Sequence, residues 1–290
     1  MGVICWTHCP TRVMNHKSII LNSAFLILNS LHMVFSPIDW SLLIVGALLI
    51  GISKTGLPGT GVLAVIVIAN VIVGRLVNGA TTPMLILGDC FAVWWYARFA
   101  RWDKVRELIP SVAVGAFIGV IFLYFLDDNA AGRTLFNRVL GGIVLVMLAL
   151  YLLRKQLGDR LTPTTAGGRF LSGSTAGFST YVGNAAGPIM SIYMSALKLP
   201  KMEFMGTTAV YYFIFNLSKI PIFIFLQWLA PQKPTFNSTT LTTNLIMVPF
   251  VIAGVFVGKW MLPRIPQRTF EIIVLVLSAL AALRLVISWP

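Results

Sequence analysis

Charge is scarce in this chain of 290 residues: only 11% are charged, whereas 57% are hydrophobic. A soluble domain carries about 25% charged residues, so the composition excludes an ordinary soluble protein. The mean hydropathy of +0.86 agrees with this exclusion. The regular alternation of apolar and polar residues that marks an outer-membrane barrel is also missing. We therefore expect an all-α polytopic membrane protein.

Acidic residues are rarer than basic ones, with 9 Asp and Glu against 22 Lys and Arg, which gives a net charge of +13. The basic residues cluster in short loops between apolar runs, as in a membrane protein with positively charged cytoplasmic loops. No zinc-finger spacing and no long basic run is present. A nucleic-acid partner is not expected.

Cysteine and catalytic motifs are also sparse. Cys90 lies in an apolar run and is expected to be a packing residue. Cys5, His8 and Cys9 cluster near the N-terminus, but three ligands make a weak metal site. The chain has no His-Glu-x-x-His and no Gly-x-Ser-x-Gly sequence, and Ile86 stands where an intramembrane aspartyl protease motif around Asp89 needs glycine. No enzyme, metal or cofactor is expected.

Turn and charge signals divide the chain into apolar segments at 38–51, 61–74, 79–98, 108–126, 137–153, 170–182, 186–197, 204–229, 242–262 and 269–288. The predicted domains are a first membrane repeat at 36–155, a cytoplasmic linker at 156–169 and a second repeat at 170–290. Residues 1–35 are an optional extension. They contain either a signal anchor or untranslated sequence upstream of a start at Met33.

Two interruptions of the apolar pattern are the most informative feature, and they lie at residues 51–61 and 177–188. Each separates two apolar arms that are shorter than the about 20 residues needed to cross a bilayer. Backbone without helical hydrogen bonds survives at membrane depth only where protein or water surrounds it. Paired interrupted segments in two halves of a membrane protein point to a transporter's binding site.

The two halves also align without a gap around these interruptions. Gly51 matches Gly177, Ser53 matches Ser179, Gly61 matches Gly187, and the pair Thr81-Thr82 matches Thr207-Thr208. Later, Gly115-x-x-x-Gly119 is echoed by Gly254-x-x-x-Gly258. Such spaced glycines also have a plain packing role, because they let helices approach closely.

Basic loops at 98–107, 154–169 and 259–268 fall on one side if each short-armed pair forms a hairpin that returns to the face it left. We assign that side to the cytoplasm. Corresponding loops of the two halves then face opposite sides. The expected architecture is two inverted repeats, each a broken, re-entrant helical hairpin followed by three transmembrane helices, a recurrent design of secondary transporters.

Lys54 is the sharpest candidate for substrate binding, inside the first interruption beside Thr55. A cation at membrane depth is costly and is a functional candidate by default, although a lysine can also snorkel to an interface. Glycines let backbone N–H groups turn toward a ligand, and a helix starting near Gly61 offers an anion site at its N-terminus. The glycines of this group are Gly56, Gly59 and Gly61.

In the second interruption, Asn184 and the N–H groups of Gly183 to Gly187 are the expected binding groups, and Pro188 suits the first turn of a helix. The alternative is a simple structural kink. Further along, Asn216 and Lys219 precede Pro221 inside an apolar segment. Lys219 is either a second cation for the anion or a partner for the carbonyl near Leu217 that the proline frees.

Asp89 has three interpretations that the sequence leaves open. It pairs with Lys54, pairs with Lys219, or carries a coupling proton. Four threonines start helices after the two hairpins, and they either cap those helices or line the cavity. They are Thr81, Thr82, Thr207 and Thr208.

These motifs resemble the sulfite exporter TauE/SafE family. The resemblance rests on short motifs in both halves of the chain. They are Gly-Ile-Ser-Lys-Thr-Gly-Leu-Pro-Gly at 51–59, Gly88-Asp89 with the basic loop 98–106, Gly-Asn-Ala-Ala-Gly-Pro at 183–188, Glu-Phe-Met-Gly-Thr at 203–207 and residues 216–221. It covers about residues 36–288 and implies a bacterial inner-membrane carrier of small, often sulfur-containing anions. The extension 1–35 departs from the family, as does Lys-Thr-Gly-Leu-Pro-Gly where other members carry three glycines, and this puts the substrate in doubt.

The resulting hypothesis is a multi-pass secondary transporter in the cell inner membrane, moving a small anion such as sulfite or an organosulfonate by alternating access. Its partners are the anion and membrane lipid, and a homo-oligomer is left open. The alternatives are an accessory membrane subunit without transport and a passive anion channel. The anion, the direction of transport and the coupling ion do not follow from the sequence.

Overall fold

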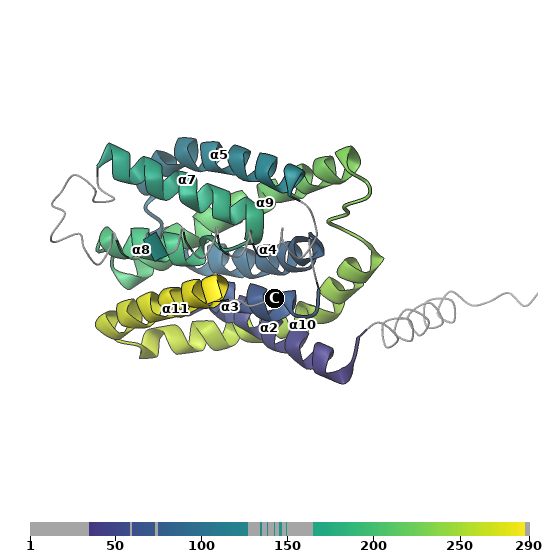
Figure 1. Cartoon of the computed structure of the whole chain (residues 1–290). Helices are drawn as coiled ribbons and strands as arrows, with labels where there is room; N and C mark the ends of the chain where they lie inside the picture. Colours follow the sequence, from purple (N-terminus) through teal and green to yellow (C-terminus); the bar gives the residue numbers. More distant parts are fainter. Residues whose placement is uncertain are drawn as a thin grey trace, which may run out of the picture. The chain divides into compact units, whose positions relative to one another are not determined.

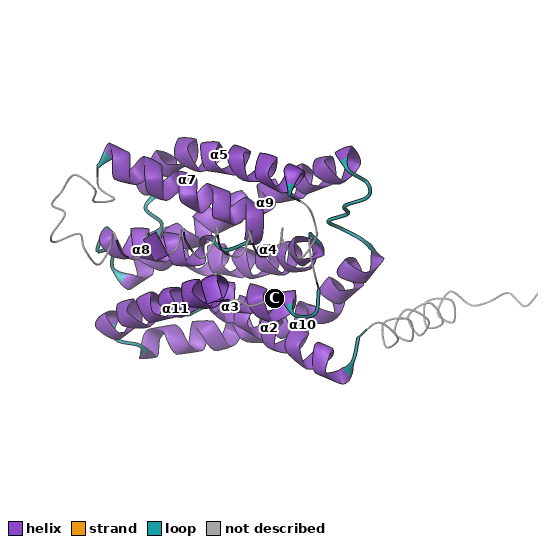
Figure 2. Ribbon diagram, in the orientation of Figure 1, coloured by secondary structure: helices purple, strands orange, loops and turns teal. Residues whose placement is uncertain are grey.

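A computed structural model describes residues 35–58, 60–72, 75–126 and 165–287, with single positions at 134, 138, 142, 145, 146 and 149. Within these ranges every regular element is helical and no strand occurs (Figure 2). The expected helix at 137–153, the loop 127–136, most of the linker and the extension to residue 34 lie outside the described residues, so they remain predictions.

The chain divides into two units, Met1–Trp40 and Ser41–Pro290. In the small unit, Phe35 and Trp40 pack edge to face with ring centroids 5.5 Å apart. Ser36 and Asp39 exchange backbone-to-side-chain hydrogen bonds, with Asp39 accepting from Ser36 N at 2.8 Å. This reciprocal pair is a helix-starting arrangement, and a helix begins at Pro37.

Figure 1 shows the helices of the chain in order. They are α2 (Pro37–Thr55), α3 (Thr60–Ala69), α4 (Leu76–Tyr96), η1 (Ala97–Phe99), α5 (Trp102–Phe125), α7 (Ala166–Gly183), α8 (Ala186–Ala196), α9 (Lys201–Leu229), α10 (Ser238–Met261), η3 (Leu262–Arg264) and α11 (Gln267–Ile287).

Five of the described helical stretches are long and apolar enough to cross a membrane: Pro37–Thr55, Leu76–Phe99, Trp102–Phe125, Lys201–Leu229 and Ser238–Arg264. Several begin before the predicted apolar segments, because an apolar run marks the middle of a helix and misses its polar first turn. The start of α10 is the clearest case, since Asn237 and Thr240 form a capping box there.

The two interrupted segments are broken helices. Along α2 and α3, Gly61 lies opposite Ser53 and Gly46 lies opposite Ile68, so α3 folds back on α2 as a hairpin. Figure 1 shows α8 likewise returning toward the end of the larger unit where α7 begins. Nearly every residue of α8 is buried, which suits a helix that is apolar on all sides.

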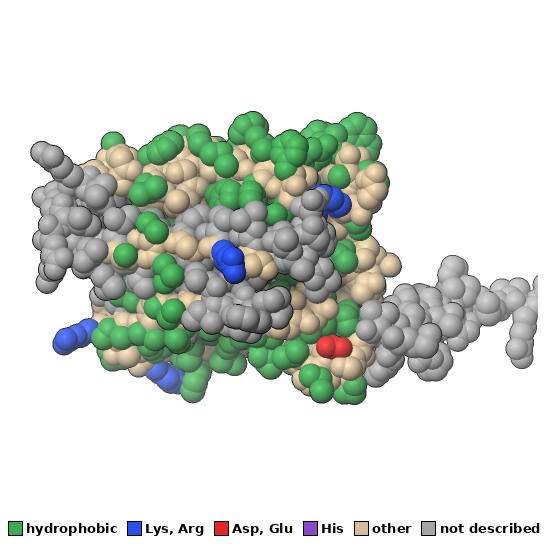
Figure 3. All heavy atoms as spheres, viewed as in Figure 1, with side chains coloured by type: hydrophobic (Ala, Val, Ile, Leu, Met, Phe, Trp, Pro, Cys, Tyr) green, Lys and Arg blue, Asp and Glu red, His purple; other side chains and the backbone are tan. Residues whose placement is uncertain are grey.

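Outward-facing side chains are largely apolar, as the visible face in Figure 3 shows. Large exposed hydrophobic residues recur on the long helices, among them Trp94, Phe117, Phe125, Trp228 and Leu245. An apolar surface of this extent suits contact with lipid. Cys90 is exposed on α4, so its prediction as a buried packing residue is wrong.

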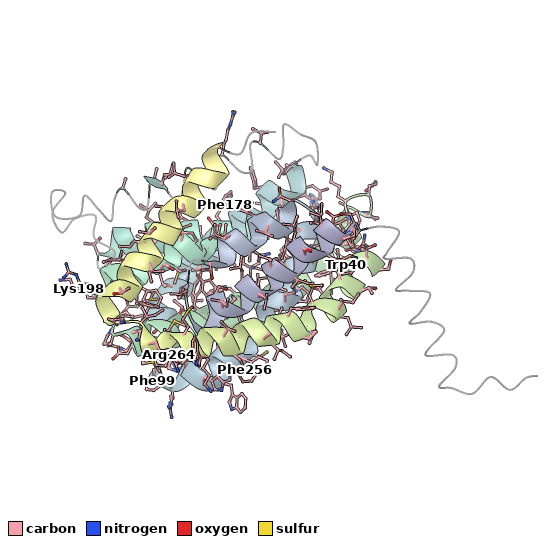
Figure 4. The ribbon with its side chains drawn as sticks, turned by 90° about the horizontal axis from the view of Figure 1, so that it is seen from below. Trp40, Phe99, Phe178, Lys198, Phe256 and Arg264 are labelled. Atoms are coloured by element: carbon pink, nitrogen blue, oxygen red, sulfur yellow. The ribbon has the colours of Figure 1, made fainter. Side chains whose placement is uncertain are left out.

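Several basic residues lie together at one end of the larger unit, although Arg75 and Lys233 lie near the opposite end of α5. Arg101 contacts Glu203 at 3.4 Å, and Arg169 contacts Glu107 at 3.7 Å. Figure 4 shows Phe99 of η1 and Arg264 of η3 at this same end. The described parts of the basic loops therefore share one end, as the sequence predicts.

Candidate functional site

The first helix break is shorter than predicted. Helix α2 continues through Thr55 and α3 begins at Thr60, so the predicted interruption from Gly51 starts about one turn too early. Pro58 explains the position, because a proline disfavours helical backbone at the preceding residue, Leu57. Lys54 consequently lies in the last turn of α2 and not in the interruption itself. A cation is favourable there because the helix dipole is negative at its C-terminus.

The second break spans only two residues. Asn184 adopts the left-handed conformation, with φ 53° and ψ 25°, and ends α7. Asparagine tolerates this conformation better than most residues, which is why it terminates helices. Helix α8 starts at Ala186, and Pro188 lies in its first turn, where a missing N–H leaves no bond unmade. The predicted role of Pro188 is confirmed, whereas 177–183 is helical and not interrupted.

Both breaks open onto one cavity. It is lined by Ser53, Lys54, Pro58, Gly61, Val62, Leu85, Thr180, Asn184, Ala186, Gly187, Tyr212, Asn216 and Lys219. The space open to the centres of water-sized groups is about 40 Å³. Roughly 10–15 Å³ on this measure holds one water molecule, so the cavity suits a group about the size of a small oxyanion.

The first turns of α3 and α8 both face this cavity, through Gly61 and Val62 on one and Ala186 and Gly187 on the other. The first N–H groups of a helix have no partner within the helix. They carry the positive end of the helix dipole, and this end attracts anions. Two such ends therefore contribute to a single small space.

Lys54 forms a buried ion pair with Asp89 of α4, with Nζ 2.8 Å from Oδ1. Lys54 Nζ also lies 4.4 Å from the centre of the Tyr212 ring, an arrangement that favours a cation. Asp89 itself does not line the cavity but lies behind Lys54, fully buried. Of the three interpretations of Asp89, the structure places it with Lys54.

A hydrogen-bonded chain continues from Asp89 across the site. The Asn216 amide donates to Asp89 Oδ2 at 2.5 Å, while its carbonyl oxygen accepts from Lys219 Nζ at 2.7 Å. Lys219 Nζ also donates to Asn184 Oδ1. Lys219 is thus bound to two amide oxygens that border the cavity. The hydrogen bonds of Lys219 in the described structure go to these side chains and not to the carbonyl near Leu217.

Asn184 extends this chain into α4. Its amide nitrogen donates to Thr81 Oγ1 at 2.8 Å and to Asn78 Oδ1 at 3.1 Å. Asn78 in turn donates to the Val182 carbonyl near the end of α7. The break between α7 and α8 is therefore connected through side chains to α4 and α9. A simple structural kink does not require these side-chain hydrogen bonds to other helices.

The predicted site residues divide into two groups. Those that line the cavity are Lys54, Gly61, Asn184, Gly187, Asn216 and Lys219. Thr55, Gly56 and Gly183 do not line it, and Gly59 lies outside the described residues. The sequence could not separate these groups, because all the glycines near a break look alike in an apolar background.

Thr55 and Gly56 have a packing role. Thr55 Oγ1 donates to the Val255 carbonyl at 2.6 Å, and the Thr55 carbonyl accepts from the Tyr96 hydroxyl at 2.9 Å. Gly56 lies against Gly258, where a Cβ atom would approach the Gly258 Cα to 2.6 Å. These contacts fix the end of α2 against α4 and α10, and neither residue lines the cavity, so a ligand contact for them stays a prediction.

Neither role predicted for the four threonines, helix capping or cavity lining, is seen in the structure. Thr81 and Thr82 lie inside α4, and Thr207 and Thr208 lie inside α9. Thr81 accepts the bond from Asn184, and Thr207 Oγ1 accepts from the backbone N–H of Arg101 at 3.0 Å. None of the four lines the cavity.

Tyr212, which was not predicted from the sequence, lines the cavity from α9. Its hydroxyl is buried and has no hydrogen-bond partner among the described residues. The available signal was spacing, because positions 212, 216 and 219 fall on one face of a helix. Ser53, Pro58, Val62, Leu85, Thr180 and Ala186 were also missed as lining residues.

Fold and site together define a helical, multi-pass membrane protein with a polar cavity where two broken helices meet. A family model described as sulfite exporter TauE/SafE matches residues 7–285, and the chain belongs to this family. The match includes residues 7–35, so the expectation that the extension 1–35 departs from the family is wrong for most of its length. Its members are membrane transporters and not enzymes. No curated protein and no solved structure gives a significant match to the chain.

Proposed function

We propose that the protein is a secondary transporter that moves a small anion, a sulfur oxyanion or organosulfonate such as sulfite, across the cell inner membrane by alternating access. The observation that carries this proposal is the cavity in which Lys54, Lys219 and the first turns of α3 and α8 converge. Two ammonium groups and two positive helix ends around one small space favour an anion. The family match supports sulfur-containing anions.

Each half of the protein contributes matching positions to this cavity. Lys54 and Thr180 align in the two halves, as do Pro58 with Asn184 and Gly61 with Gly187, and all six line the space. A substrate bound between corresponding parts of two repeats is the arrangement expected of alternating access. In the proposed site, Lys54 and Gly61 hold the anion from one side and Asn184 and Gly187 hold it from the other.

Helix packing supports the inverted-repeat architecture. A Cβ atom at Gly51 would collide with the Val251 carbonyl, and one at Gly254 with the Leu48 carbonyl. The same pattern recurs in the other half, where Gly177 lies against the Val112 carbonyl and Gly115 against the Ser174 carbonyl. Leu48 aligns with Ser174 as Gly51 does with Gly177.

The first arm of each hairpin thus packs against the glycine-containing helix of the other half: α2 on α10, and α7 on α5. Such an exchange supports two structurally equivalent repeats. We propose repeats at 36–155 and 170–290, joined by a linker at 156–169. The end carrying Arg101, Arg169 and Arg264 is proposed to face the cytoplasm, because short basic loops remain on that side.

Asp89 is the proposed coupling residue. Its contact with Lys54 joins α4 to α2, so a change in the charge of either partner alters the contact between a broken helix and a spanning helix. Replacement of this pairing by a pairing of Lys54 with substrate is a simple way to link binding to movement.

Anion-dependent thermal stabilisation of the purified protein tests the binding proposal. A ligand that binds only the folded state stabilises it by roughly 2.7 kcal/mol at a hundred times its dissociation constant. We would screen sulfite, sulfate, thiosulfate, taurine, sulfoacetate and small carboxylates. A shift with one anion that disappears in Lys54→Ala supports the site, and no shift with any anion contradicts it. Saturable flux then separates a carrier from a channel, and absence of flux favours the accessory-subunit alternative.

A further inference from the structure

The described side chains around the cavity include more basic groups than acidic groups. Lys54 and Lys219 both line the cavity, whereas Asp89 is the one carboxylate in contact with either lysine among the described residues. With the lysines as ammonium groups, the formal sum is +1. Because an unpaired charge is costly inside a protein, a site of this kind is most stable when its ligand brings the sum to zero.

We infer that the cavity is balanced for one negative charge and selects monoanionic oxyanions, such as sulfonates, over dianions, such as sulfate. This inference rests on the proposed function, because it names the charge class of the anion bound at the same site. It concerns selection between anions of similar size, so the volume of the cavity alone does not account for it.

Asn216 lies between the carboxylate of Asp89 and the ammonium group of Lys219. Its amide donates to Asp89 and its carbonyl oxygen accepts from Lys219, so the amide dipole is oriented between a carboxylate and an ammonium group. This orientation stabilises the charged form of both partners. The other carboxylate oxygen, Oδ1, forms the ion pair with Lys54 Nζ at 2.8 Å.

Lys219 and Tyr212 each keep a donor for a ligand. An ammonium group has three N–H donors, and Lys219 places two on the amide oxygens of Asn184 and Asn216. Tyr212 adds a buried hydroxyl with no hydrogen-bond partner among the described residues. A buried hydroxyl without a hydrogen-bond partner lowers the stability of the protein, and a bound ligand can supply that partner. The oxygens of a sulfonate meet these needs while adding a single charge.

The test compares methanesulfonate with sulfate, because both keep a fixed charge across the neutral pH range. Dissociation constants are measured by calorimetry on the purified full-length protein. We expect wild type to bind methanesulfonate roughly tenfold or more tightly than sulfate, because the second charge of sulfate stays unpaired. Asp89→Asn raises the formal sum to +2, so sulfate becomes the preferred anion.

A double variant separates charge from shape. Lys54→Gln lowers the formal sum to zero and weakens binding of both anions. Adding Asp89→Asn to Lys54→Gln restores the sum to +1, so the preference for methanesulfonate returns. This comparison stands even if Asp89→Asn alone does not fold, because the double variant removes both partners of the Lys54–Asp89 ion pair together.

Equal or tighter binding of sulfate by wild type overturns the inference. An unchanged preference in Asp89→Asn, or a double variant no better than Lys54→Gln, also overturns it. In those cases anion binding itself persists and the proposed transporter stands. Failure of wild type to bind either anion overturns the inference as well, and the wider anion panel then decides whether the proposed function fails with it.

Discussion

Lys219 of α9 donates a hydrogen bond to the side-chain carbonyl of Asn184, the residue whose left-handed backbone ends α7. One residue therefore both breaks the helix and presents an amide to a buried lysine. The same amide reaches Thr81 on α4. Asn184 therefore determines both where α7 ends and how Lys219 is held. Substitutions at this position can separate the two roles.

Asn184→Gly separates the two roles of Asn184, because glycine adopts the left-handed conformation freely. We expect this variant to fold, with a stability loss of about 1–2 kcal/mol from the missing hydrogen bonds, and to lose anion binding. Asn184→Ala should lose about 1 kcal/mol more, since alanine is strained in that conformation. Melting temperature and anion stabilisation measure both effects, and a glycine variant with normal anion affinity contradicts the assignment.

Thr81 and Thr82 form a matched pair for testing the polar chain. Thr81 accepts from Asn184, whereas the buried Thr82 hydroxyl has no hydrogen-bond partner among the described residues. We expect Thr81→Val to lower anion affinity and to cost about 1 kcal/mol of stability. Thr82→Val should leave affinity unchanged. Equal effects of the two substitutions on affinity would rule out a specific role for the contact with Asn184.

Thr55 tests the distinction between helix contacts and ligand contacts. Its hydroxyl donates to the Val255 carbonyl on α10 and does not line the cavity. Thr55→Val is expected to reduce stability by about 1–2 kcal/mol, because it leaves a buried carbonyl without that donor. Relative affinities for different anions should not change. A change in anion preference would return Thr55 to the binding site.

Gly51 and Gly177 test the equivalence of the two halves. A methyl group at either position collides with a backbone carbonyl of the partner helix, Val251 or Val112. Overpacking of this kind costs about 1–3 kcal/mol, so Gly51→Ala and Gly177→Ala should lower the melting temperature by similar amounts. Gly167→Ala is the control, since nothing lies within 4 Å of its added carbon. A large effect at only one of the two positions argues against equivalent packing.

Much of the site could be predicted because its members stand out against an apolar background. A lysine, an aspartate or an asparagine at membrane depth is conspicuous, so Lys54, Asp89, Asn184, Asn216 and Lys219 were found from the sequence. Which of them touch could not be predicted. The bond from Asn216 to Asp89 joins residues 127 positions apart, and no local pattern encodes such a pairing.

The errors have a common physical origin in tertiary packing. Gly51 suggested a helix break, yet it is a helical contact that lets α10 approach. Thr55 suggested a ligand contact, yet its partner lies 200 positions away. Tyr212 could not be singled out from the sequence, because aromatic residues are common along the chain and their usual role is packing. The helices and their breaks follow from local sequence patterns and could be predicted. The tertiary contact that each glycine or threonine makes depends on distant residues and could not be predicted.

Uptake of the stabilising anion into proteoliposomes tests the central claim most directly. Wild type, Lys54→Ala and Lys54→Arg are compared at equal protein levels, with Lys104→Ala as a control because Lys104 makes only surface ion pairs of little energetic weight. The account predicts saturable uptake by wild type and by Lys104→Ala, partial uptake by Lys54→Arg, and none by Lys54→Ala. Normal uptake by correctly folded Lys54→Ala would contradict the assignment of this cavity as the anion site.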